Sequence, residues 1–254
     1  MSGGRWSSAG RLLLLPTNTR MNVRLSLLCA VLAAFLAPPV QAFTVTFAGD
    51  YGAGKHAREV LQRIAALAPD THFALGDFSY AVASDLPESA WCDMVKGYVK
   101  SPFLLLPGNH ESNGEHGDIV KFAACLPYRH PSPFAGEYPH QYYLDMPAAK
   151  PLARFIMLSP NLPFTDGRQF EYKADNANMK WLKAAIDDGR EKGMKWIIVG
   201  MHKLCITTEG KSCEIGEELA NMLVRSGVDI VLNGHAHVYE RSYPLSCVKS
   251  GAFD

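Results

Sequence analysis

The 254-residue sequence predicts an α/β fold with a polar site at one edge of a sheet. The first observation is a strand, helix and strand in succession: the β-branched and aromatic run 43–48 and the apolar run 71–75 enclose a stretch of helical periodicity that ends at Pro69. Such a βαβ unit makes its two strands parallel neighbours. The second observation is that five apolar runs are each followed at once by a polar loop. Loops that leave the strands of α/β proteins are where their sites are built.

Further elements are expected along the rest of the chain. Apolar periodicity predicts helices at 87–99, 119–126, 174–192 and 217–225. Short apolar runs predict strands at 103–106, 196–199 and 230–233, of which 196–199 is expected to be buried. Between 127 and 151 the composition shifts to Pro, Tyr and His, and the runs 141–145 and 154–158 predict strands of a more exposed, antiparallel kind. No repeat or linker interrupts this order, so we expect residues 43–254 to form one domain.

Residues 1–42 have the pattern of a cleaved secretory signal peptide. They contain four arginines and no acidic residue, and the apolar run from Leu25 to Leu36 precedes the small-residue pattern that ends at Ala42. An apolar run of about a dozen residues is too short to span a bilayer comfortably, so no stable membrane insertion is expected after cleavage. An uncleaved membrane anchor is the alternative. Translation starts at Met1 or at Met21. We expect a secreted protein, in an extracellular, periplasmic or lysosome-like compartment.

The charge and the cysteines of the remaining chain bear on its partners and its disulfides. Without residues 1–42 the chain has 21 basic against 25 acidic residues, so no basic patch predicts nucleic-acid binding. Five cysteines remain, and their odd number leaves at least one outside any intrachain pair. Because Cys205 and Cys213 bracket a short loop, we predict a disulfide between them.

Seven side chains in the five polar loops are candidate metal ligands. Seven mixed oxygen and nitrogen donors are too many for one ion and suit two ions that share a carboxylate. Hard oxygen donors beside imidazoles favour iron, manganese or zinc over calcium. Two ions about 3.5–4 Å apart can hold a phosphoryl group and acidify an attacking water, which predicts hydrolysis of a phosphate ester. The candidates are Asp50, Asp77, Tyr80, Asn109, His202, His235 and His237.

Each motif by itself has an ordinary structural explanation. Asp77 and Tyr80 after Gly76 are typical of a turn with a packed tyrosine, and a lone His-x-His is more often a surface pair. His235 and His237 alternate by two, so both serve one site only if the loop turns or the ions lie on either side of it. The joint occurrence of five such loops at strand ends favours the metal site.

These loops resemble the five signature blocks of the calcineurin-like metallophosphoesterases, and more narrowly those of the purple acid phosphatases of the small, single-domain type. Tyr80 is the discriminating residue, because most other members of the superfamily lack a tyrosine ligand there. The resemblance runs from about Phe43 to Pro244 and implies a four-layer α/β/β/α sandwich of two mixed sheets flanked by helices. The family continues beyond the 17 residues that follow His237 here, so a sandwich incomplete at its C-terminus is an open alternative. The blocks are Asp50 with Gly52, Gly76-Asp77 with Tyr80, Gly108-Asn109-His110-Glu111, Gly200-Met201-His202 and Gly234-His235-Ala236-His237.

The resemblance also implies a role for each residue. Asp50, Tyr80 and His237 would hold Fe(III). Asn109, His202 and His235 would hold a divalent Fe, Zn or Mn ion. Asp77 would bridge the two metals, and His110 would bind the phosphate or protonate the leaving group. Phenolate is a hard, charged donor that suits a trivalent ion, and such an ion acidifies bound water strongly.

The activity implied is that of a secreted acid phosphatase, in which a metal-bound hydroxide attacks a small phosphomonoester. A phosphodiesterase with two divalent ions and an inactive, truncated phosphate-binding homologue are the alternatives. Glu111 is expected to be a helix cap or a group behind the ligands. The sequence indicates neither the natural substrate nor the oligomeric state.

Overall fold

Two β-sheets lie between two layers of helices in the computed structural model, which describes residues 42–81, 86–249 and 252–253. The smaller sheet has the order β1-β2-β3 and its strands are all parallel, because a helix connects each strand to the next. The expectation of two mixed sheets therefore holds for the larger sheet and is wrong for this one. Its strands are β1 (Val45–Ala48), β2 (Thr71–Leu75) and β3 (Phe103–Leu106). The parallel pairing of β1 with β2 confirms the predicted βαβ unit. The predicted signal peptide lies, up to residue 41, outside the described residues.

The larger sheet is mixed and has the order β4-β5-β6-β7-β8. Strands β4, β5 and β6 pair antiparallel, and β6, β7 and β8 pair parallel. Its strands are β4 (Phe134–Glu137), β5 (Gln141–Met146), β6 (Ala153–Leu158), β7 (Trp196–Met201) and β8 (Ile230–Asn233). Two further short strands, β9 (Val248–Lys249) and β10 (Ala252–Phe253), pair antiparallel with each other.

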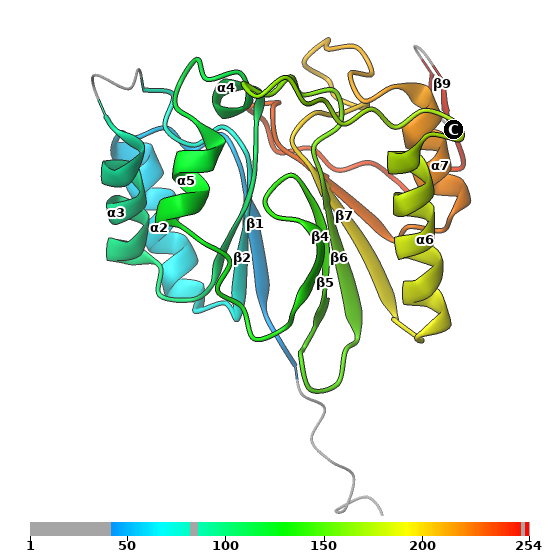
Figure 1. Cartoon of the computed structure of the whole chain (residues 1–254), viewed down its shortest axis with the longest axis horizontal. Helices are drawn as coiled ribbons and strands as arrows, with labels where there is room; N and C mark the ends of the chain where they lie inside the picture. The colour runs from blue at the N-terminus through cyan, green and yellow to red at the C-terminus, as the bar shows by residue number, and fades with distance from the viewer. Residues whose placement is uncertain (1–41, 82–85, 250–251, 254) are drawn as a thin grey trace, which may run out of the picture. The chain divides into compact units, whose positions relative to one another are not determined.

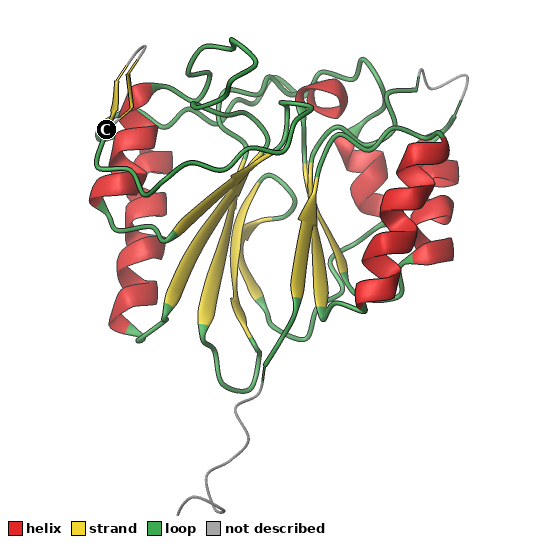
Figure 2. Cartoon of the chain, turned by 180° about the vertical axis from the view of Figure 1, so that it is seen from behind, coloured by secondary structure: helices red, strands yellow, loops and turns green. Residues whose placement is uncertain are grey.

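Helices cover the outer face of each sheet, which confirms the predicted four-layer α/β/β/α order (Figures 1 and 2). On the side of the smaller sheet lie α2 (Lys55–Leu67), α3 (Glu88–Tyr98) and α5 (Ile119–Cys125). On the side of the larger sheet lie α6 (Ala177–Glu191) and α7 (Glu217–Arg225). The one-turn helix α4 (Asn109–Ser112) directly follows β3, where a loop was expected. None of the helices in the described ranges has both the length and the apolar character needed to cross a bilayer.

Aromatic packing joins the layers. Between the sheets, the ring of Phe73 stacks on Phe47 at 5.0 Å and on Phe155 at 5.1 Å, and Phe73 and Phe155 are fully buried. Beneath α3, the buried ring of Trp91 lies 5.1 Å from that of Phe78. Phe78 directly follows Asp77, so the loop after β2 is anchored in the core next to a candidate ligand. Buried aromatic pairs of this kind contribute about 0.5–1.5 kcal/mol each beyond their area.

Burial of the strands departs from the expectation at two places. Strands β5 and β6 are antiparallel as predicted, but the prediction that they are more exposed is wrong: every residue of β6 is buried. They lie in the interior of the five-stranded sheet, with the smaller sheet on one face and α6 on the other. Conversely β7, expected to be buried throughout, begins with Trp196, which is 51% exposed. Local composition does not reveal a strand's position in its sheet.

Two disulfides are present among the described residues. The predicted pair Cys205–Cys213 is confirmed. The pair Cys92–Cys125, which spacing alone did not single out, joins α3 to α5.

Candidate metal centre

The carboxyl ends of five strands meet at one edge of the molecule. Backbone hydrogen bonds join the loops that leave them: Asp50 N donates to Gly76 O at 2.9 Å, and Gly234 N donates to Met201 O at 3.3 Å. Parallel pairing brings the carboxyl ends together within each sheet, and His235 N, which donates to Asp50 Oδ2 at 2.9 Å, joins the two sets of loops. All seven predicted ligand residues lie on these loops.

Several of these loops turn sharply at the candidate ligands themselves. Four of the seven residues have positive φ angles: Asp50 (56°), Asp77 (54°), Tyr80 (54°) and His235 (71°). Residues other than glycine rarely adopt this left-handed region, and when they do it marks turns and functional sites. The backbone turns at His235 and is not an extended strand there. The side chains of His235 and His237 therefore need not point in opposite directions, although the two residues alternate by two.

Neighbouring loops approach so closely that some positions require glycine. A Cβ atom on Gly108 would lie 2.0 Å from Asp77 Oδ1, and one on Gly76 would lie 2.4 Å from Gly108 N. Any side chain at either position would therefore displace the Asp77 loop. The two glycines of these motifs allow the loops after β2 and β3 to touch.

One half of the site is centred on the hydroxyl group of Tyr80. Its oxygen lies 3.0 Å from Asp50 Oδ1, 3.0 Å from Asp77 Oδ2 and 3.1 Å from His237 Nε2. His237 Nε2 also lies 3.5 Å from Asp50 Oδ1. Two carboxylates, a phenol and an imidazole thus converge on one small volume, and the His237 side chain, 64% exposed, forms its outer wall.

The other half is centred on His202, whose side chain is fully buried. Its Nε2 atom lies 3.1 Å from Asn109 Oδ1 and 3.3 Å from Asp77 Oδ1. Its Nδ1 atom lies 2.7 Å from the Leu75 carbonyl oxygen. A carbonyl accepts only, so Nδ1 carries a proton and donates it to Leu75, and Nε2 is the ring atom that faces the site. The ring of His235 lies 5.0 Å away, centroid to centroid.

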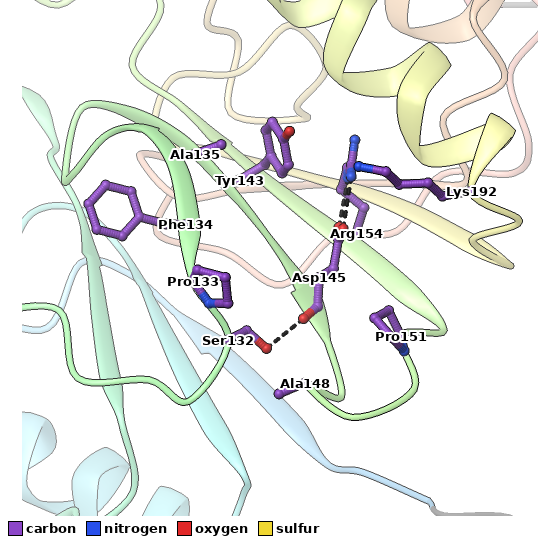
Figure 3. A pocket seen from close by; sticks show the side chains of 10 residues that line it. All are labelled: Ser132, Pro133, Phe134, Ala135, Tyr143, Asp145, Ala148, Pro151, Arg154 and Lys192. Atoms are coloured by element: carbon purple, nitrogen blue, oxygen red, sulfur yellow. Dashed lines mark hydrogen bonds and ion pairs between the residues drawn. The ribbon is translucent and has the colours of Figure 1, made fainter.

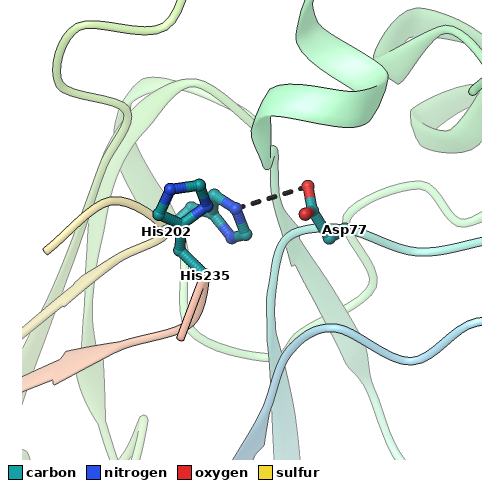
Figure 4. A group of neighbouring side chains, drawn as sticks. All are labelled: Asp77, His202 and His235. Atoms are coloured by element: carbon teal, nitrogen blue, oxygen red, sulfur yellow. Dashed lines mark ion pairs between the residues drawn. The ribbon is translucent and has the colours of Figure 1, made fainter. Parts of the chain in front are cut away.

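Asp77 lies between the two halves. Its Oδ2 atom faces Tyr80 and its Oδ1 atom faces His202. Asp77, His202 and His235 each offer a ligand atom within 4.8 Å of the others, and Figure 4 shows the two rings opposite the carboxylate. This is the arrangement needed for a carboxylate that bridges two ions.

The electrostatics of the donor set favour cations. Burial raises the pKa of Asp77, but its hydrogen bond and charge interaction with His202 outweigh burial and hold that pKa at about 2. Burial raises the pKa of Asp50. Burial, and then the charges of Asp50 and Asp77, raise the pKa of Tyr80, so without a cation its phenol keeps the proton. A positive ion would neutralise the clustered carboxylates and favour the phenolate, so the residues present fit a metal pair.

His110 and Glu111 follow Asn109 at the start of α4. His110 Nε2 lies 3.7 Å from Asp77 Oδ2, and the side chain, 24% exposed, borders solvent. Glu111 is buried and accepts hydrogen bonds from Gly108 N at 2.6 Å and from Asp77 N at 2.9 Å. Burial, and then the charge of Asp77, raise the pKa of Glu111 to about 7. Glu111 thus joins the loops behind the donors, as expected from the sequence.

Sequence reasoning missed two further residues at this site. Glu214 Oε2 lies 2.8 Å from His235 Nε2, and His116 Nδ1 lies 2.6 Å from His110 Nδ1. Neither residue follows an apolar run. For Glu214, the signal present in the sequence was its place next to Cys213, at the end of the predicted disulfide loop.

Comparison with known proteins agrees with this geometry. Residues 43–239 match the family model described as Calcineurin-like phosphoesterase. The chain belongs to this phosphoesterase family.

Relatives of this phosphoesterase include purple acid phosphatases. Purple acid phosphatase 18 of Arabidopsis thaliana is 27% identical over 225 residues, covering 84% of this chain and 48% of the relative. Phosphoenolpyruvate phosphatase of Allium cepa is 27% identical over 224 residues, covering 82% of this chain and 44% of the relative. The phosphoesterase chain therefore spans about half the length, or less, of these curated relatives.

A solved structure shares the fold of the phosphoesterase. The purple acid phosphatase PPD1 from yellow lupin (Lupinus luteus) seeds superposes with a TM-score of 0.54 at 17% identity, covering 79% of this chain and 39% of that one. At this identity the likeness shows the fold.

A hollow of about 320 Å³ on the phosphoesterase lies apart from the candidate metal centre (Figure 3). It is lined by Arg154, near the start of β6, whereas the metal centre follows the opposite end of the neighbouring strand β7. The Arg154 guanidinium is bound by both oxygens of Asp145, at 2.7 and 2.8 Å, and by Asp188. A phosphate entering this hollow would have to displace a carboxylate from Arg154. The Arg154 guanidinium is therefore not free to bind a phosphate.

Proposed function

We propose that this phosphoesterase is a secreted acid phosphatase that hydrolyses small phosphomonoesters at a dinuclear Fe(III)–M(II) centre, where M is Fe, Zn or Mn. The observation that carries the proposal is the position of the Asp77 carboxylate, with one oxygen toward Tyr80 and the other toward His202. The similarity to the curated relatives named purple acid phosphatase 18 and phosphoenolpyruvate phosphatase supports the choice of a phosphomonoester over a diester.

Seven side chains would hold the metals. Fe(III) would be held by Asp50, Tyr80 and His237, and M(II) by Asn109, His202 and His235, with Asp77 shared by both. When bound, such a pair of ions neutralises the phosphate and acidifies the attacking water. The tyrosine is the donor that suits a trivalent ion, because its pKa is raised here and only a strongly charged cation would displace its proton.

The remaining groups bind, orient and move protons. His110 lies beside Tyr80, with ring centroids 4.7 Å apart, and its Nε2 atom points toward Asp77 at the entrance of the site. From there Nε2 would bind a phosphate oxygen or deliver a proton to the leaving alcohol. Glu214 would hold the His235 ring by its contact with Nε2. The Nδ1 atom of His235 would then be the ligand atom. Glu111 would keep the loops of Asp77 and Asn109 in place.

The compartment is part of the proposal. Two disulfides among the described residues fit an oxidising environment. The signal-like residues 1–42 support secretion.

Metal analysis combined with turnover of an aryl phosphate tests the proposal. We expect two metal ions per chain, one of them iron, and greater activity on p-nitrophenyl phosphate than on bis(p-nitrophenyl) phosphate. Two divalent ions with preference for the diester would support a phosphodiesterase instead. Bound metal without any turnover would indicate a binding protein and refute the proposed activity.

A further inference from the structure

A second group of metal-ligating side chains lies next to the candidate metal centre. His110, Glu115 and His116 each offer one ligand atom, and these atoms all lie within 4.8 Å of one another. The Nδ1 atoms of the two histidines are 2.6 Å apart, and Glu115 Oε2 is 3.7 Å from His110 Nδ1. The proposed reaction uses His110 through Nε2 and uses neither of the other two residues.

We propose that His110, Glu115 and His116 form an additional binding site for a late first-row divalent cation such as Zn²⁺, and that its occupancy slows turnover. Two imidazoles and one carboxylate are a ligand set of zinc sites with three protein ligands, in which water takes the fourth position. Imidazole donors select zinc, copper or nickel over magnesium and calcium.

The backbone that carries the three donors forms a closed turn. His116 N donates to His110 O at 2.9 Å, and Glu115 N donates to Asn113 Oδ1 at 2.9 Å. Ser79 Oγ donates to His116 O at 3.3 Å, which ties the turn to the Tyr80 loop. The donors therefore start close to one another, and a cation would not have to order a flexible loop before binding.

Access and geometry both permit binding. The side chains of His110 and Glu115 are 24% and 56% exposed, so a hydrated cation reaches them from solvent. Two nitrogens bound tetrahedrally at about 2.0–2.1 Å from zinc are about 3.3 Å apart. The two Nδ1 atoms, now 2.6 Å apart, would separate by about 0.7 Å, a movement within reach of a small rotation of the rings.

The site is coupled to the metal centre through one imidazole. His110 Nε2 faces Asp77 at 3.7 Å, whereas Nδ1 faces His116. A cation on Nδ1 would replace the contact with His116 and fix the ring, so that it no longer adjusts to the substrate. This inhibitory effect rests on the proposed phosphatase activity, whereas cation binding does not.

Calorimetric titration of the isolated, metal-loaded protein with ZnCl₂ near pH 7 tests the site itself. The variants are Glu115→Gln and His116→Ala, with metal content measured before each titration. His56→Ala is the matched control, because His56 Nδ1 lies 3.2 Å from Glu59 Oε2 in an exposed pair. We expect the wild type and the control to bind one additional Zn²⁺, and both test variants to bind it at least about 10-fold more weakly. Equal binding by all four proteins, or the same loss in the control, would overturn the proposal.

The inhibitory effect is measured as the Zn²⁺ concentration that halves each protein's own basal rate on p-nitrophenyl phosphate. That concentration should rise at least about 10-fold in His116→Ala and stay unchanged in His56→Ala. An unchanged value in His116→Ala would contradict the coupling. If the protein has no phosphatase activity, the proposed function fails, and the titration still decides whether the cation site exists.

Discussion

The buried histidine His72 sets a limit on how well this fold tolerates acid. His72 lies in β2 with no exposed surface, and burial lowers the pKa of its imidazole to about 3. Its Nδ1 atom lies 2.8 Å from Thr46 Oγ1 and its Nε2 atom 2.5 Å from the Tyr51 hydroxyl, so both nitrogens are partnered in the neutral form. Unfolding exposes the ring and returns its pKa to about 6.5.

The sign of the effect follows from proton binding. Between pH 6.5 and pH 3 the unfolded chain binds a proton at His72 that the folded protein does not, so acid favours the unfolded state. The contribution of His72 to the free energy of unfolding is fully present above pH 6.5 and falls by about 1.4 kcal/mol per pH unit below it. Between pH 7 and pH 4.5 the loss is about 2.5 kcal/mol.

The variant His72→Gln removes this titration. At pH 7 it should be less stable than the wild type by about 1 kcal/mol, because the amide does not place its polar atoms where both ring nitrogens were, so either Thr46 or Tyr51 loses its contact at this position. Urea unfolding at pH 7 and pH 4.5 should show the wild type losing about 2.5 kcal/mol more than the variant. His56→Gln, at an exposed position, should keep the wild-type pH dependence. If wild type and His72→Gln lost the same free energy, the buried imidazole would not be neutral and the reasoning would be wrong.

Three further predictions concern the metal centre. Asp77→Asn should lose most of the turnover, because an amide bridges two cations poorly; retained turnover on p-nitrophenyl phosphate would count against the bridging role. His110→Ala should slow the reaction while two metal ions per chain remain by elemental analysis; loss of both ions would show that His110 is a ligand. Glu214→Gln should weaken binding of the divalent ion by about 10-fold in chelator competition, since the charged contact that holds the His235 ring is lost; unchanged metal retention would refute that role.

Much of the fold was predictable because it depends on local pattern. Its apolar composition placed the run 71–75 in a strand, and the βαβ rule made it parallel to β1. Parallel strands present their carboxyl ends at one edge, so polar residues after each run, such as Asp50 and His202, were expected to meet. The structure brings them together around Asp77.

The parts that sequence did not predict depend on long-range contacts. The burial of β6 follows from its interior place in the five-stranded sheet, which the run 153–158 does not encode. Glu214 and His116 reach the site through loops without periodicity, and only the folded positions of His235 and His110 show their use. Whether His235 and His237 serve one site depended on a positive φ angle at His235, which single-residue preferences do not favour.

The most direct test of the account is the visible spectrum of the purified protein together with its iron content, compared between wild type and Tyr80→Phe. If the Tyr80 phenolate binds Fe(III), the iron-containing wild type has a charge-transfer band that gives a purple colour, and the variant lacks the band. A colourless wild type with two bound metal ions and full activity would contradict the Fe(III)–tyrosinate centre, as would a band that persists in Tyr80→Phe.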